Sequence, residues 1–225
     1  KFLKQNPAIS MCGSWIEELS SSGTHLGITP FPTTHSEIQN RIPYQNVFCH
    51  GSIMARKDDF MRLKGYREEF KHSQDYDLWL RYIELFKVAN LKTPLYRRII
   101  SPDSISFINK EKQKQYADLA RNCYLARKAK MNEPIHLFEN ISKMESKFKN
   151  QKKIYSGYKF YCGRRLYANS KMRLARKYFF SSLFFNVLAL KNIIYIFFTF
   201  LPKNLRRVFE KIWLNGKEKY NLRID

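Results

Sequence analysis

The segment that decides most about this chain is SQDYDLWLRYIELF, which spans residues 73–86. Its apolar side chains recur every three or four positions between Leu78 and Leu85, the spacing that covers one face of an α-helix. Ser73 stands directly before this pattern and is one of the residue types favoured at helix N-caps. The sequence therefore predicts a helix over 73–86 that carries Asp75 in its first turn.

Strands are predicted on both sides of this helix. Residues 8–18 have the pattern of a buried strand, and the Ser-, Gly- and Thr-rich turn that follows leads to a hairpin strand over 25–29. The segment VFCHGSIMARK (47–57) alternates as a strand does. Further expected elements are a helix over 33–42 capped by Thr33 or Thr34, a helix over 58–66 stopped by Gly65, and two short strands over 87–91 and 94–100.

The second half of the chain is predicted to be helical throughout. The expected helices are 109–130, a shorter one after Pro134, 151–168, 171–185, 187–201 and 203–214. Strands followed by helices favour an α/β domain with a helical extension.

Positive charge is concentrated in one part of the sequence. The whole chain has 225 residues, 44% of them hydrophobic, and a net charge of +22. Residues 141–180 alone hold 12 lysines and arginines against one acidic residue. Such a block favours a polyanionic partner, either nucleic acid or an anionic lipid surface, with a merely solvated basic face as the alternative.

The four cysteines, Cys12, Cys49, Cys123 and Cys162, lie far apart in the sequence. A structural zinc site needs close pairs, and a disulfide scaffold needs a higher density of cysteine. We expect reduced thiols in or near the core.

The apolar stretch over 178–201 has the 24 residues needed to cross a bilayer. Lys191 would then lie near the middle of the membrane, where one lysine costs roughly 2.5–3.5 kcal/mol. A helix in the membrane interface, supported by the basic residues that follow it, is the preferred interpretation. A spanning helix and a buried core helix remain the alternatives.

Three segments are informative through their order and spacing along the chain: NVFCHGSIMARKDDFMRLKGYREEF (46–70), SQDYDLWLR (73–81) and PLYRRIISPDSIS (94–106). Together they resemble the acceptor-side half of family 2 glycosyltransferases with the Rossmann-like GT-A fold. The resemblance covers residues 1–106 and extends more loosely over 155–186. It implies that 1–108 are the C-terminal half of a GT-A domain and 109–186 a helical extension. The apolar and basic composition of 187–225 predicts helices that associate with a membrane.

The resemblance places Asp75 at the position of the family's catalytic base. An inverting transfer needs a carboxylate that takes the proton of the attacking acceptor hydroxyl. A position in the first turn of a helix favours the ionised carboxylate, because the helix amino end is positive. A simple helix-capping role is the alternative. The sequence departs from the family at Gln74, where an acidic residue is commoner, and Asp77 is expected to be structural.

Further substrate-binding residues are implied around this base, and Gln74, which directly precedes it, is one of them. His50, Gly51 and Ser52 match a strand motif that lines the sugar and acceptor pocket, with a satisfied core histidine as the alternative for His50. Arg97 or Arg98, of which we prefer Arg98, matches an arginine that meets the donor diphosphate.

The resemblance also implies a metal that this chain does not hold. GT-A enzymes bind Mg²⁺ or Mn²⁺ through a D-x-D motif, and the one literal match here, Asp75-Tyr76-Asp77, belongs to the helix already described. We expect the donor-binding half and the metal ligands to precede Lys1, so that this part alone is inactive.

The resemblance thus implies an inverting glycosyltransferase of surface polysaccharide biosynthesis, and the basic and apolar composition favours a position peripheral to the cytoplasmic side of the cell membrane. Its expected partners are a nucleotide-sugar donor, a glycan or lipid-linked acceptor and an anionic membrane surface, but not nucleic acid. The alternatives are a basic nucleic-acid-binding protein and a membrane-peripheral helical protein without catalysis.

Overall fold

The computed structural model describes residues 1–138, 141 and 150–213. Two compact units are interleaved along the chain. Unit 1 consists of Lys1–Ile16, Pro30–Tyr96 and Asn109–Lys147, and unit 2 of Glu17–Thr29, Arg97–Ile108 and Phe148–Asp225. The division predicted from the sequence, at 108/109 and 186/187, is consecutive along the chain and stays a prediction.

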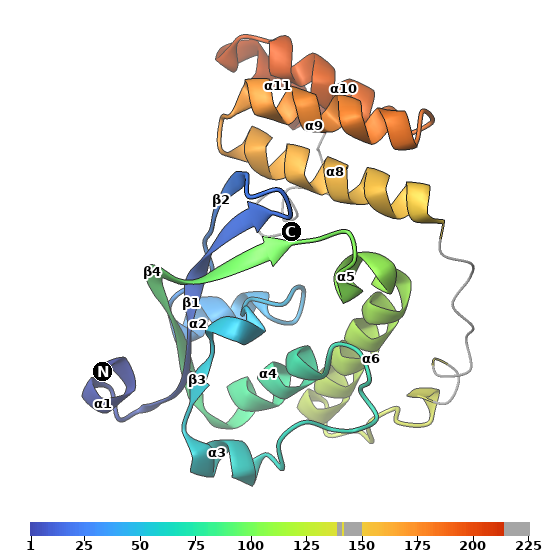
Figure 1. Cartoon of the computed structure of the whole chain (residues 1–225). Coiled ribbons are helices and arrows are strands. Elements are labelled where there is room, and N and C mark those ends of the chain that lie inside the picture. Colours follow the sequence, from blue (N-terminus) through green and yellow to red (C-terminus); the bar gives the residue numbers. More distant parts are fainter. Residues whose placement is uncertain (139–140, 142–149, 214–225) are drawn as a thin grey trace. The chain divides into compact units, whose positions relative to one another are not determined.

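Unit 1 combines part of the sheet with helices (Figure 1). The strand β1 pairs with the short strand β3 in antiparallel register, with Met11 opposite Ala55, and β4 also pairs with β1. The elements are α1 (Phe2–Gln5), β1 (Ile9–Ser20, which continues into unit 2), α2 (His35–Arg41), the 3₁₀ turn η1 (His50–Ser52), β3 (Met54–Ala55), α3 (Lys57–Arg62), α4 (Gln74–Leu85), β4 (Lys87–Ile100, also continuing) and α6 (Lys110–Lys128).

The core of unit 1 is built around α4, which packs against α6. Leu78, Trp79, Leu80 and Tyr82 are almost fully buried, so apolar side chains cover more than one side of this helix. The helix is therefore fixed on several sides, and the residues at its amino end are held with it.

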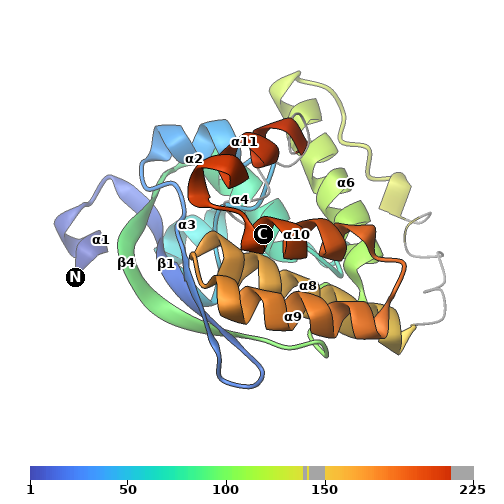
Figure 2. The ribbon, with the colours of Figure 1, turned by 90° about the horizontal axis from the view of Figure 1, so that it is seen from above.

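Unit 2 is mainly helical. The end of β1 pairs with β2 (His25–Thr29), and α8, α9 and α10 run side by side (Figure 2). Gly163 of α8 permits close helix packing, because a Cβ at this position would lie 2.6 Å from the ring of Phe179 on α9. The helices are α5 (Ile105–Ile108), α8 (Gln151–Ala168), α9 (Met172–Phe185), α10 (Leu190–Phe200) and α11 (Lys203–Trp213).

Most of the predicted elements are confirmed. The buried strand, the hairpin strand and the helices near 33–42, 58–66, 73–86, 109–130 and beyond 150 are present. Thr34 caps α2 through a capping box with Glu37. All four cysteines are buried and none forms a disulfide, as expected. The helix predicted after Pro134 extends into residues outside the described ones.

Two strand predictions are confirmed only in part. Within residues 47–57 only Met54–Ala55 form a strand (β3), while His50–Ser52 form a 3₁₀ turn, because the amide of Ser52 donates to the carbonyl of Cys49 (2.9 Å) and its hydroxyl donates there as well. The segments 87–91 and 94–100 form the single strand β4. Pro94 is tolerated within it because this stretch is exposed, where a missing ladder hydrogen bond costs little.

The apolar stretch 178–201 is divided between two helices, since α9 ends at Phe185 and α10 begins at Leu190. Within the described residues, no helix is both long and apolar enough to cross a membrane.

Candidate active site

Asp75 is the second residue of α4, in the first turn as predicted. Ser73 occupies the N-cap in a left-handed conformation (φ 62°), but its hydroxyl donates to the carbonyl of Gln113 (2.9 Å) instead of capping the helix. The Asp75 carboxylate accepts hydrogen bonds from the Tyr76 amide (2.8 Å) and from the side-chain amide of Asn46 (3.4 Å). Both bonds orient this carboxylate.

The environment of Asp75 makes it a stronger base than an exposed aspartate. Burial raises the pKa of its carboxyl, and the hydrogen bond from the Tyr76 amide, the nearby His50 ring and Asn46 lower it only in part. The expectation that the helix end dominates is therefore wrong in direction, because desolvation outweighs the hydrogen bonds. A raised pKa increases the affinity of the carboxylate for a proton, which is what a general base requires.

An aromatic and polar cluster lies beside this helix. His50 is exposed on the 3₁₀ turn, and its Nε2 atom shares a hydrogen bond of 2.8 Å with the hydroxyl of Tyr66. Its ring lies 6.1 Å from that of Trp79, the residue one turn after Asp75 on α4. The core-histidine alternative is thus wrong, and His50 presents a polar group within electrostatic reach of Asp75.

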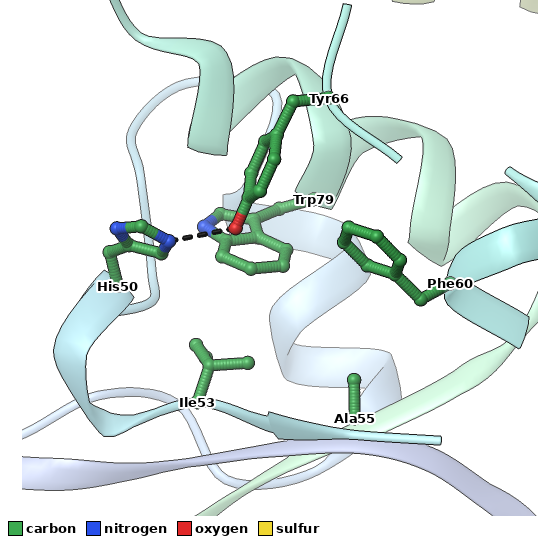
Figure 3. A pocket seen from close by; sticks show the side chains of 6 residues that line it. All are labelled: His50, Ile53, Ala55, Phe60, Tyr66 and Trp79. Carbon is green, nitrogen blue, oxygen red and sulfur yellow. Dashed lines mark hydrogen bonds between the residues drawn. The ribbon is translucent and has the colours of Figure 1, made fainter. Parts of the chain in front are cut away.

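These side chains enclose a cavity of about 200 Å³ in unit 1 (Figure 3). The charge of Asp75 acts on one residue at this cavity, since it helps to raise the pKa of Tyr66, although burial is the larger cause. The lining residues are His50, Ile53, Ala55, Phe60, Tyr66 and Trp79.

The other residues predicted to bind substrate, Ser52, Gly51 and Gln74, have different surroundings. The hydroxyl of Ser52 accepts from the Ser14 amide (3.2 Å) and donates to the Cys49 carbonyl, so it anchors the turn on β1. Gly51 lies against Tyr96, whose ring would be 2.3 Å from an added Cβ. Gln74 is the first residue of α4 and is partly exposed.

Arg98 belongs to unit 2, where it donates hydrogen bonds to the buried carboxylate of Glu18. Arg165 and Tyr161 bind the same carboxylate. This network shows a structural role for Arg98, and its predicted contact with a donor diphosphate stays a prediction.

The loop that carries Tyr66 is tied to α4 by buried charges. Asp77, fully buried, binds the guanidinium groups of Arg67 and Arg81. Arg81 also donates to the carbonyls of Leu63 (2.6 Å) and Gly65 (2.7 Å). Asp77 is therefore structural, as predicted, and it fixes the position of Tyr66 relative to the helix of Asp75.

The sequence interpretation missed Asn46, Tyr66 and Trp79 as members of the site. Trp79 follows Asp75 by four residues, which places both on one side of the helix, so helical spacing could have found it. Tyr66 and Asn46 come from other segments and could not have been found by spacing within α4.

The described residues do not fit a divalent metal. Nowhere in residues 1–138, 141 and 150–213 do three His, Cys, Asp or Glu side chains gather as ligands.

Three curated proteins are similar in sequence to part of this chain. The O-antigen biosynthesis glycosyltransferase WbnJ of Escherichia coli is 33% identical over 82 residues, which are 36% of this chain and 31% of WbnJ. "Putative glycosyltransferase EpsE" of Bacillus subtilis (strain 168) is 43% identical over 63 residues, 27% of this chain and 22% of EpsE. A UDP-Gal:alpha-D-GlcNAc-diphosphoundecaprenol beta-1,3-galactosyltransferase of Escherichia coli is 28% identical over 80 residues, 36% of this chain and 29% of that enzyme.

This chain thus covers less than a third of the length of each of these relatives. No family model matches the sequence, and no solved structure matches it either. All three relatives are nevertheless named as glycosyltransferases, so this chain is related in sequence to glycosyltransferases.

Proposed function

We propose that this chain is part of an inverting family 2 glycosyltransferase with a GT-A fold. It transfers a sugar from a nucleotide-sugar donor to a hydroxyl group of a glycan or lipid-linked acceptor in surface polysaccharide biosynthesis. The observation that carries the proposal is the Asp75 carboxylate at the start of α4, with a raised pKa and within electrostatic reach of His50 and Tyr66. The relatives support the sugar-transfer reaction, and two of their names refer to O-antigen and to a diphosphoundecaprenol-linked acceptor.

In the proposed reaction the acceptor oxygen attacks the anomeric carbon of the donor. The new carbon–oxygen bond forms as the bond to the diphosphate breaks, and the nucleoside diphosphate leaves with its electron pair. Asp75 takes the proton of the attacking hydroxyl, while Asn46 and the Tyr76 amide hold the carboxylate in place. Mg²⁺ or Mn²⁺ remains an expectation for the complete enzyme, with ligands outside the described residues.

The test uses the complete gene product that contains these residues, and measures nucleoside diphosphate release with a nucleotide-sugar and an acceptor. Asp75→Asn is expected to lower kcat by about 10²–10⁴-fold, the usual contribution of a general base, and to leave donor binding unchanged. Asp58→Asn is the matched control, because Asp58 is also the second residue of a helix but is exposed. Turnover retained by the Asp75 variant would remove this residue from the mechanism.

A membrane location is the second part of the proposal. The inward side of α10 buries Tyr195 and Phe198. Apart from Lys191, the exposed side chains of this helix are apolar. In the α9–α10 turn, Val187 and Leu188 are 75% and 88% exposed. We call the following exposed side chains the apolar face of unit 2: Phe184, Val187, Leu188, Leu190, Ile193, Phe197, Phe200, Leu205, Val208 and Phe209.

The apolar face includes a contact between two helices, since the ring centroids of Phe197 on α10 and Phe209 on α11 lie 6.1 Å apart. Patches of this kind usually mark an interface. Residues 151–213 contain 14 lysines and arginines against one acidic residue, Glu210, which favours an anionic lipid surface. We therefore place the protein at the cytoplasmic side of the cell membrane, as a peripheral protein.

Sedimentation with vesicles tests this location. We expect binding to phosphatidylcholine vesicles that contain phosphatidylglycerol and little binding to pure phosphatidylcholine. Because burying one leucine-sized side chain contributes about 1.5–3 kcal/mol, the double variant Val187→Ser, Leu188→Ser should bind at least about tenfold more weakly. Leu125→Ser is the matched control, an exposed leucine on α6. Unchanged binding of the double variant, or equal binding to DNA, contradicts the proposal.

A further inference from the structure

The cavity beside Asp75 has a polar side and an apolar side. The His50 ring, the Tyr66 hydroxyl and the indole nitrogen of Trp79 lie together, while Phe60 and Ala55 lie opposite them (Figure 3). Its volume is about 200 Å³. Since one water occupies about 30 Å³ in the liquid, the space accepts a group of several heavy atoms rather than a single water.

The indole of Trp79 lacks a hydrogen-bond partner at this cavity. The residue is only 2% exposed, and its Nε1–H donates to no atom of the described residues. The ring is held by its neighbours, with centroid distances of 5.9 Å to Phe48 and 6.3 Å to Tyr82. An indole N–H is a donor only, and a buried donor without a partner is unfavourable. The cavity therefore favours a ligand that brings an acceptor oxygen.

The remaining lining residues restrict that ligand further. Ile53, Ala55 and Phe60 offer only apolar surface, which suits a methyl group. None of the six lining residues is a lysine or arginine, and the carboxylate of Asp75 lies within electrostatic reach, so an anionic group is disfavoured. The hydroxyl of Tyr66 shares its hydrogen bond with His50 and also offers a lone pair to an N–H donor.

An acetamido group combines these properties in one neutral unit. Its carbonyl oxygen accepts from the Trp79 N–H, its N–H faces the His50–Tyr66 pair, and its methyl group occupies the apolar side. A plain sugar hydroxyl has no methyl group and would leave the apolar side filled with water. We propose that this cavity binds the acetamido group of an N-acetylated aminosugar in the acceptor, so that a hydroxyl on a neighbouring ring carbon reaches Asp75. This inference rests on the proposed function and specifies its acceptor.

The first test is direct binding, which needs no turnover. Ligand-observed NMR on the complete gene product would compare methyl 2-acetamido-2-deoxy-glucopyranoside with methyl glucopyranoside, which has a hydroxyl at the same carbon. We expect at least about tenfold tighter binding of the acetamido sugar. Trp79→Phe keeps the aromatic ring but removes the N–H, and should abolish most of this preference. Trp15→Phe is the matched control, because the Trp15 N–H is already bound to the Phe31 carbonyl (2.8 Å).

A second variant covers the case in which Trp79→Phe does not fold. Ala55→Val narrows the apolar side of the cavity and should weaken binding of the acetamido sugar while leaving the plain glucoside unaffected. Equal binding of both sugars to the unaltered protein, or a preference that both variants retain, overturns the assignment. Binding of the acetamido sugar unchanged in Ala55→Val but lost in Trp15→Phe would overturn it as well.

Activity measurements separate this inference from the proposed function. Transfer that depends on Asp75 but is equally fast to both acceptors would overturn the acetamido subsite and keep the glycosyltransferase. A preference for acetamido sugars that appears in the donor, with UDP-N-acetylglucosamine against UDP-glucose, would overturn the assignment to the acceptor. Transfer that is indifferent to Asp75→Asn would overturn the proposed function, whatever the binding preference.

Discussion

Replacement of Asp77 by asparagine tests how the site is held together. Asp77 is fully buried and is shared by Arg67 and Arg81, which are 21% and 11% exposed. Removing one partner of a buried ion pair usually costs about 3–5 kcal/mol, because the other charge is left without compensation. Arg67 keeps Glu133, and Arg81 keeps the carbonyls of the Tyr66 loop. We therefore expect Asp77→Asn to lower the free energy of unfolding of unit 1 by about 3 kcal/mol, the lower end of this range.

Urea unfolding followed by tryptophan fluorescence measures this change in a Trp213→Phe background. The remaining tryptophans, Trp15 and Trp79, both belong to unit 1. The control is Asp118→Asn, which removes an exposed ion pair with Arg121 on the surface of α6. Such pairs contribute about 0–1 kcal/mol. A cost for Asp77→Asn that does not exceed that of Asp118→Asn would refute the view that this buried network holds the site.

Two further predictions concern pH. Asp75→Asn should raise the thermal midpoint at pH 7, because burial raises the pKa of Asp75 and makes its ionised form unfavourable in the folded state. This gain in stability should disappear as the pH falls below the ordinary aspartate pKa. Calorimetry at several pH values measures the gain, and a difference that is constant at all of them would contradict the prediction. Burial alone would raise the pKa of Glu18, but Arg98 and Arg165 hold it below its ordinary value, so its contribution to the stability of unit 2 is present above that value and is lost as the pH falls through the lowered pKa. Followed by circular dichroism, the Glu18→Gln variant should therefore lose less stability on acidification than the unaltered protein does. An equal loss would argue against stabilisation of ionised Glu18 by Arg98 and Arg165.

Much of the local structure could be predicted from the sequence, because it depends on neighbours along the chain. The helical spacing between residues 73 and 86 placed Asp75 in the first turn of α4, and Thr34 was a correct cap for α2. Charge and apolar composition also indicated the basic helical part that forms most of unit 2.

Local patterns failed where contacts from elsewhere in the chain decide the conformation. Residues 47–57 alternate as a strand does, yet only Met54–Ala55 pair with β1, because the hydroxyl of Ser52 bonds to Cys49 and Ser14 and residues 50–52 form a turn. In the same way, pairing with β1 extends β4 through Pro94.

The sequence by itself determined which carboxylate lies at the amino end of a helix, because helical periodicity depends on residues that are neighbours along the chain. Only the tertiary structure decided the surroundings of that carboxylate and the direction of its pKa shift. It brings His50 and Tyr66 from separate segments within electrostatic reach of Asp75, and burial makes Asp75 a stronger base where the helix end alone predicted a weaker one. Desolvation depends on every segment that packs around a group, so no spacing within α4 could have revealed it.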